Sequence, residues 1–213
     1  MVDIALSWDF TEEFVTEDEV LTQARLKAEE LGASPVPPSV GALLKLLANL
    51  SGARAVFEIG TGGGVSGLYL LSGMPANGVL TSIDAEGEFQ RLARANFTAA
   101  GYESTRVRLF NARALDMMPR MNQGAYDLVF IDGDSLEVPY YLPQADRMLR
   151  PGGLLIITHA LLGGDVANPA KRDEKTAGMR QVVTDLGKAE DYETTVLPVA
   201  DGLLVAHKVA AAN

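Results

Sequence analysis

The stretch Phe57-Glu58-Ile59-Gly60-Thr61-Gly62-Gly63-Gly64-Val65-Ser66-Gly67 joins an apolar run to a glycine cluster, and a helix-like pattern follows it. This order predicts a strand, a tight loop and a helix. Glycine tolerates positive φ and carries no Cβ, so the loop backbone can pass close to a ligand. The following helix would direct free N–H groups and a partial positive charge into the same space. The stretch therefore predicts a binding loop.

Two acidic residues make this prediction more specific. Gly60-x-Gly62 alone occurs in nicotinamide, flavin and S-adenosylmethionine binders and in turns without a ligand. Here Glu58 lies inside the strand before the loop, and Asp84 ends the next apolar run. Asp84 follows at about the separation, roughly 20 residues, at which a carboxylate accepts from ribose hydroxyls. The third glycine position of a dinucleotide loop holds Val65, so a nicotinamide cofactor is the weaker alternative.

The composition limits the class of protein. A chain of 213 residues with 47% hydrophobic content can bury one core, so we expect a single domain over 1–213, with a helical extension at 1–50 and the cofactor-binding and catalytic core at 51–209. The net charge of −10 disfavours nucleic acid or an anionic membrane as a partner. The absence of cysteine rules out disulfides and a thiol nucleophile. Without a long apolar segment or a signal-peptide pattern, we expect a cytoplasmic protein.

The residue patterns predict an α/β fold. Strands are expected in the apolar run before Gly60 and at 79–83, 106–110, 126–131, 154–157, 193–199 and 202–208. Helices are expected at 12–31, 39–50, 66–72, 86–100, 114–118, 138–149 and 175–186. The alternation predicts a doubly wound, Rossmann-like and mostly parallel seven-stranded sheet, and Asp201-Gly202 predicts an antiparallel C-terminal hairpin.

Four motifs carry a family resemblance. They are the stretch at 57–66, Asp-Leu-Val-Phe-Ile-Asp-Gly-Asp at 127–134, Leu-Arg-Pro-Gly-Gly at 149–153 and Leu-Pro-Val-Ala-Asp-Gly-Leu at 197–203. Together they resemble the class I S-adenosylmethionine-dependent methyltransferases, and within them the catechol and caffeoyl-CoA O-methyltransferase-like family. The resemblance spans about 18–208. It implies S-adenosylmethionine as cofactor, and a homodimer with the N-terminal helix at the interface.

The resemblance also implies the cofactor site. Glu58, Gly60 and Thr61 would face the methionine part, and Asp84 would hold the ribose hydroxyls. Arg113 falls near the adenine, where the family usually has aspartate. The full set of implied cofactor-binding residues is Val36, Glu58, Gly60, Thr61, Gly62, Ser66, Asp84, Ala85, Arg113 and Asp132.

The family's metal site is altered in this chain. Asp132 matches an aspartate that holds a divalent cation, usually Mg²⁺, in the resembled family, which makes it the predicted metal ligand. The family's Asp-Asn pair after the next strand is replaced by Thr158-His159, and its lysine by Ser135. Since a hard cation such as Mg²⁺ needs several oxygen ligands, we expect metal dependence to be weakened or lost.

His159 and Asp132 are the predicted catalytic residues. Methyl transfer from a sulfonium needs an acceptor oxygen that is in line and deprotonated at or near attack. Histidine, with an ordinary pKa near 6.5, suits the role of base. Two alternatives stay open: a structural hydrogen bond from His159, and a softer ion such as Zn²⁺ or Mn²⁺ bound by Asp132 and His159.

We therefore predict an S-adenosylmethionine-dependent O-methyltransferase whose partner is a small, phenolic hydroxyl acceptor. The alternatives are a non-catalytic S-adenosylmethionine-binding protein with a decayed site and an NAD-linked oxidoreductase. The candidates for an aromatic wall at the acceptor site are Trp8, Phe10, Phe14, Tyr140 and Tyr141, together with the loop 161–166. The alternative for most of these aromatic residues is a place in the apolar core, where such side chains are more often found.

Overall fold

The computed structural model describes residues 4–209, which fold around one seven-stranded sheet of order β3-β2-β1-β4-β5-β7-β6. The strands are β1 (Ala55–Ile59), β2 (Val79–Asp84), β3 (Val107–Asn111), β4 (Tyr126–Ile131), β5 (Leu149–Ile157), β6 (Tyr192–Leu197) and β7 (Leu203–Lys208). The first five strands are parallel, while β7 runs antiparallel to both β5 and β6. The predicted doubly wound sheet with a C-terminal hairpin is confirmed.

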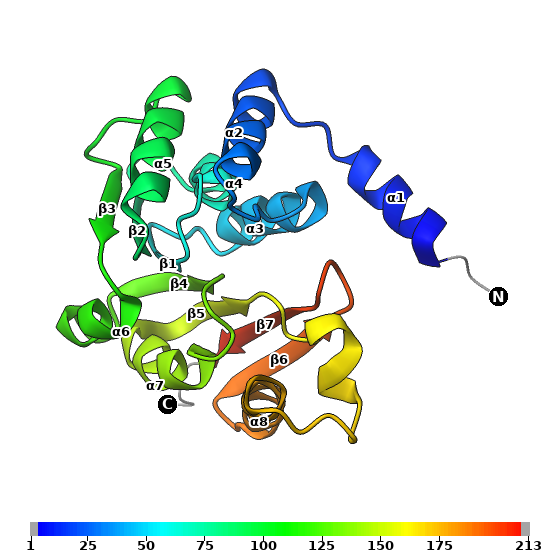
Figure 1. Ribbon diagram of the computed structural model, residues 1–213. Coiled ribbons are helices and arrows are strands. Elements are labelled where there is room, and N and C mark those ends of the chain that lie inside the picture. The colour runs from blue at the N-terminus through cyan, green and yellow to red at the C-terminus, as the bar shows by residue number, and fades with distance from the viewer. Residues whose placement is uncertain (1–3, 210–213) are drawn as a thin grey trace.

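Helices cover both faces of the sheet (Figure 1). One face carries α2 (Glu19–Glu30), α3 (Pro38–Leu50), α4 (Val65–Gly73) and α5 (Gly87–Ala99). The other face carries α6 (Ala114–Met117) with the short η1 (Met118–Arg120), then α7 (Val138–Met148) and α8 (Glu174–Lys188). Along β4, Leu128 and Phe130 join the apolar core on one face, whereas Val129 and Ile131 join the core on the other. Strands buried on both faces explain the continuous apolar runs of the sequence.

The predicted helix at 12–31 is wrong, because the chain forms two helices there. α1 (Ile4–Phe14) ends before the segment 15–18, and α2 begins at Glu19. Asp18 is the reason for the break: its carboxylate accepts from the Leu21 backbone N–H at 2.9 Å, which caps a new helix. In Figure 1, α1 projects from the rest of the chain.

Between residues 149 and 167, the structure differs from the prediction in two details. β5 begins at Leu149, so the Pro-Gly-Gly turn lies inside the strand, where the register against β4 shifts between Tyr126 and Leu128. A short helix, η2 (Leu162–Ala167), follows β5. Within residues 4–209, no helix combines the length and apolar character that crossing a bilayer requires.

The sheet order places the site. The chain reverses its direction of winding between β1 and β4, and open α/β sheets bind ligands in the crevice at such a switch point. Gly60 follows β1, and Asp132 follows β4. Backbone hydrogen bonds continue past the strands, with Asp132 N donating to Ile59 O at 2.8 Å and Thr158 N to Ile131 O at 3.0 Å. The polar residues after β1, β4 and β5 therefore lie side by side.

Candidate active site

Gly60 occupies a position that only glycine fits. Its φ is 92°, in the left-handed region. A Cβ at Gly60 would lie 2.1 Å from the carbonyl oxygen of Asp132. The loop after β1 and the loop after β4 can approach this closely only because Gly60 has no side chain.

Two adjoining cavities meet at this point, and they share Gly60, Asp84 and Asp132. The first, of about 240 Å³, lies between the glycine loop and the segment 32–36. The second, of about 410 Å³, extends past the end of β2 to Tyr141. Every predicted cofactor-binding residue except Glu58 lines one or both cavities. The structure therefore brings the predicted cofactor residues together.

Glu58 lies beneath the glycine loop and is fully buried. Its carboxylate accepts from the Ser66 hydroxyl at 2.6 Å and from the Ser82 hydroxyl at 2.5 Å. Burial raises the pKa of Glu58 to about 7, although the two serine hydrogen bonds act in the opposite direction. Thr61 shares a hydrogen bond with Ser82 at 2.7 Å and accepts from Gln90 at 2.8 Å. Glu58 thus stabilises the glycine loop without lining a cavity itself. Its hydrogen bond with Ser66 connects it to the first cavity, which Ser66 lines.

Asp84 also stabilises the glycine loop, through a hydrogen bond with its backbone. One carboxylate oxygen accepts from the Gly62 backbone N–H at 2.9 Å, and the other accepts from the Glu86 backbone N–H at 2.9 Å. Because a carboxylate oxygen has a second lone pair, Asp84 can still accept from a hydroxyl in the cavity. This position suits the predicted contact with ribose.

Arg113 lines the larger cavity. Its guanidinium donates to Glu137 at 2.8 Å, and the Tyr141 hydroxyl donates to the other Glu137 oxygen at 2.5 Å. Glu137 was not predicted as a site residue, since an acidic residue before a helix carries no distinctive signal. Tyr141 was expected at the acceptor site, but it lines this cavity.

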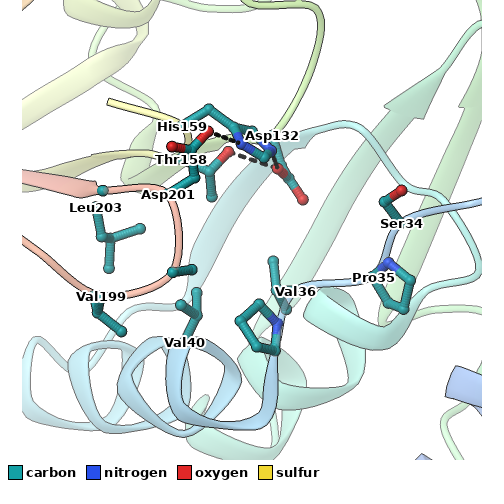
Figure 2. Close-up of a pocket in the computed structure, with 13 residues that line it drawn as sticks. Ser34, Pro35, Val36, Val40, Asp132, Thr158, His159, Val199, Asp201 and Leu203 are labelled. Atoms are coloured by element: carbon teal, nitrogen blue, oxygen red, sulfur yellow. Dashed lines mark hydrogen bonds and ion pairs between the residues drawn. The ribbon is translucent and has the colours of Figure 1, made fainter. Parts of the chain in front are cut away.

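A third, smaller cavity adjoins the first and has a volume of about 110 Å³ (Figure 2). Its wall is mostly apolar and is formed by Pro35, Val36, Pro37, Val40, Val199 and Leu203. Asp132, Thr158, His159 and Asp201 form its polar end. In the described part of the chain, none of the aromatic residues expected at the acceptor site lines this cavity, and Phe10, Phe14 and Tyr140 are exposed.

The four polar residues form a connected group. The Thr158 hydroxyl donates to Oδ1 of Asp132 at 2.5 Å, and His159 Nε2 lies 3.6 Å from the same oxygen. On the other side of the ring, His159 Nδ1 lies 3.1 Å from Oδ2 of Asp201. Burial raises the pKa of Asp132, while the Thr158 hydrogen bond and the nearby imidazole act in the opposite direction. Asp201 was predicted only as a turn residue, because Asp-Gly is a common hairpin signal.

The side chains at the polar end of the small cavity do not form a suitable set of ligands for a hard divalent cation. Mg²⁺ and Mn²⁺ require several oxygen ligands, yet the groups beside the Asp132 carboxylate are a hydroxyl that donates to it and an imidazole. Among residues 4–209, no three histidine, cysteine or acidic side chains are grouped to hold a metal ion. Asp132 as a metal ligand stays a prediction, and Asp132 with His159 alone provides too few ligands for Zn²⁺.

The fold and the site together define a class of protein. A glycine loop after β1, a carboxylate at the end of β2 and cavities at the switch point form a nucleotide-type binding site, which fits the S-adenosylmethionine-dependent methyltransferases that the sequence motifs resemble. The family model described as O-methyltransferase matches residues 11–209. The chain belongs to this O-methyltransferase family, and it is an enzyme of that kind.

Similar proteins agree with this assignment. A protein of Mycobacterium tuberculosis (strain H37Rv) that bears the name of an O-methyltransferase is 45% identical over 199 residues, which cover 93% of this chain and 89% of the relative. The O-methyltransferase TomG from Streptomyces achromogenes, solved in complex with S-adenosylmethionine, is 30% identical with a TM-score of 0.87, over 99% of this chain and 100% of TomG. An O-methyltransferase from Bacillus cereus, solved with S-adenosylhomocysteine, is 25% identical with a TM-score of 0.87, over 96% and 100% of the two chains.

Proposed function

We propose that this enzyme transfers the methyl group of S-adenosylmethionine to a hydroxyl of a small, phenolic acceptor without help from a divalent cation. The observation that carries the proposal is the apolar cavity with a polar end, since it shares Val36, Asp132 and His159 with the cavity along the glycine loop. An acceptor in the small cavity would therefore lie next to the methionine part of the cofactor.

The chemistry requires few groups. Bound S-adenosylmethionine supplies an electrophilic methyl group on a sulfonium. The protein must hold the acceptor oxygen in line with that methyl group and remove the hydroxyl proton. His159 has an imidazole at the polar end of the cavity, where a base is needed.

The shape and charge of the small cavity favour one class of acceptor. A volume of about 110 Å³ suits a single ring, since cavities on the order of 150 Å³ bind benzene. Among the described residues, no lysine or arginine lines the cavity, whereas Asp132 and Asp201 contribute two carboxylates. An anionic acceptor would be repelled, so a neutral or cationic phenol is preferred.

A two-step experiment tests the proposal. Calorimetric titration with S-adenosylmethionine, with and without Mg²⁺ or Mn²⁺, comes first. Release of S-adenosylhomocysteine is then measured over a panel of phenols and matched carboxylate-bearing phenols, with and without EDTA. We expect cofactor binding, turnover of neutral phenols that EDTA leaves unchanged, and weak turnover of the carboxylates. Turnover that requires the metal would contradict the metal-free proposal, and binding without turnover on any phenol would contradict the acceptor class.

We also propose that the protein contacts neither nucleic acid nor membrane and that it works in the cytoplasm.

We propose further that the protein is a homodimer. α1 supports the dimer, because Phe10 and Phe14 are 68% and 76% exposed and their ring centroids lie only 6.5 Å apart. Such a paired aromatic surface suits burial against a second copy. Light scattering on the purified chain should give twice the chain mass, and a Phe10→Ser, Phe14→Ser variant should give the chain mass.

A further inference from the structure

The hairpin between β6 and β7 contacts the segment that follows β5. Ala160 N donates to the carbonyl oxygen of Gly202 at 3.0 Å, and Leu161 N donates to that of Asp201 at 3.0 Å. Gly202 makes this approach possible, because its φ is 87° and a Cβ would lie 2.7 Å from the Leu161 nitrogen. These backbone contacts bring the Asp201 carboxylate beside the His159 ring.

Each oxygen of the Asp201 carboxylate has its own donor. Oδ2 lies 3.1 Å from His159 Nδ1, and Oδ1 accepts from the Gly163 backbone N–H. The Gly163 contact fixes how the carboxylate is turned. His159 itself has a φ of 55°, a left-handed conformation that histidine adopts more readily than most residues. The ring is therefore oriented from both its backbone and Asp201.

This arrangement determines which ring nitrogen carries the proton. An ionised carboxylate only accepts hydrogen bonds, so a neutral His159 must place its proton on Nδ1 to bond Asp201. Nε2 then keeps its lone pair. The charged group that faces Nε2 is Asp132, whose Oδ1 is 3.6 Å away, beyond hydrogen-bond length, and already accepts from Thr158. Nε2 is thus left without a hydrogen-bond partner among the described residues, and His159 lines the polar end of the small cavity (Figure 2).

We propose that Asp201 is a positioning residue for methyl transfer, which holds the His159 proton on Nδ1 and leaves Nε2 as the base. This inference rests on the proposed function. The acceptor O–H bond breaks and its proton moves to Nε2, while the acceptor oxygen bonds to the methyl carbon. The methyl–sulfur bond breaks, and its electron pair stays on sulfur. The resulting imidazolium lies between Asp132 and Asp201 and, being 47% exposed, returns its proton to water.

Asp201→Asn separates this role from a structural one. The Gly163 N–H should hold the amide oxygen in place, so that the amide NH₂ faces Nδ1. Because that NH₂ group only donates, the His159 proton must move to Nε2, which removes the base. We expect kcat to fall roughly 100-fold or more, as in other enzymes where a histidine base loses its correct tautomer. The affinity for S-adenosylhomocysteine and the unfolding midpoint should stay close to those of the wild type.

Glu193→Gln is the matched control, because it makes the same carboxylate-to-amide change beside the other histidine. His207 Nδ1 lies 3.4 Å from Glu193 Oε2, and neither residue lines the cavities of the site. We expect this variant to retain full turnover.

The deciding measurement is ¹⁵N NMR of the ring nitrogens at a pH where both imidazoles are neutral, since the chain has only two histidines. We expect an Nδ1–H tautomer at His159 in the wild type and an Nε2–H tautomer in Asp201→Asn. This readout needs no acceptor, so it stands even if no phenol is methylated. A wild-type Nε2–H tautomer would overturn the positioning role, and so would Asp201→Asn with the altered tautomer and undiminished turnover.

Discussion

The buried carboxylate of Glu58 predicts a specific pH dependence of stability. In the unfolded chain this group has an ordinary pKa of 4.5, whereas burial raises it to about 7 in the fold. The folded state therefore holds the proton more tightly. Its contribution to stability is fully present below the unfolded pKa and is lost as the pH rises through about 7. At about 1.4 kcal/mol per pKa unit, the full loss is about 3.5 kcal/mol, of which about 3 kcal/mol falls between pH 4.5 and 8.5.

Glu58→Gln isolates this effect, because the amide does not titrate and is nearly the same size. Urea unfolding at several pH values between 4.5 and 8.5 yields the free energy of unfolding of both proteins. The wild-type value minus the variant value should fall by about 3 kcal/mol across the range. Glu193→Gln, at a side chain that is 77% exposed, should run parallel to the wild type. If the wild type and Glu58→Gln also ran parallel, folding would leave the pKa of Glu58 at its ordinary value, and the reasoning from its burial would be refuted.

Three further predictions concern the cofactor site. Gly60→Ala should abolish binding of S-adenosylhomocysteine in calorimetry and lower the free energy of unfolding by about 1–3 kcal/mol, because the new Cβ has no room. The control is Gly124→Ala, which is also at positive φ but has no atom within 4 Å of the new Cβ. This control variant should still bind S-adenosylhomocysteine. Equal binding by both would contradict the steric argument. Asp84→Ala should weaken the affinity for S-adenosylhomocysteine roughly tenfold or more in the same titration, since a hydrogen-bond acceptor for the ribose hydroxyls is lost. An unchanged affinity would show that Asp84 is not part of the binding site. In thermal unfolding, S-adenosylhomocysteine at 100 times its Kd should stabilise the wild type by about 2.7 kcal/mol and NADH should not, whereas a comparable shift with NADH would favour the dinucleotide alternative.

Local sequence was sufficient for most of the fold and for the glycine loop after β1. The strands are buried on both faces and therefore appear as continuous apolar runs, and Gly60 and Asp84 belong to segments that leave the sheet at its C-terminal edge. The helical pattern at 12–31 misled the prediction, because the spacing of apolar residues continues through a break that Asp18 creates by capping α2.

The small apolar cavity and the partner of His159 were decided by the tertiary structure alone. The small cavity is lined by segments near positions 35, 159 and 200, and no local pattern shows that they meet. Asp201 lies 42 positions from His159 along the chain. They become neighbours because β7 pairs antiparallel with β5, with Ile157 opposite Leu204, so that the hairpin returns to the end of β5. That register depends on how both faces of the finished sheet are buried, which is a property of the whole fold rather than of the Asp-Gly pair itself.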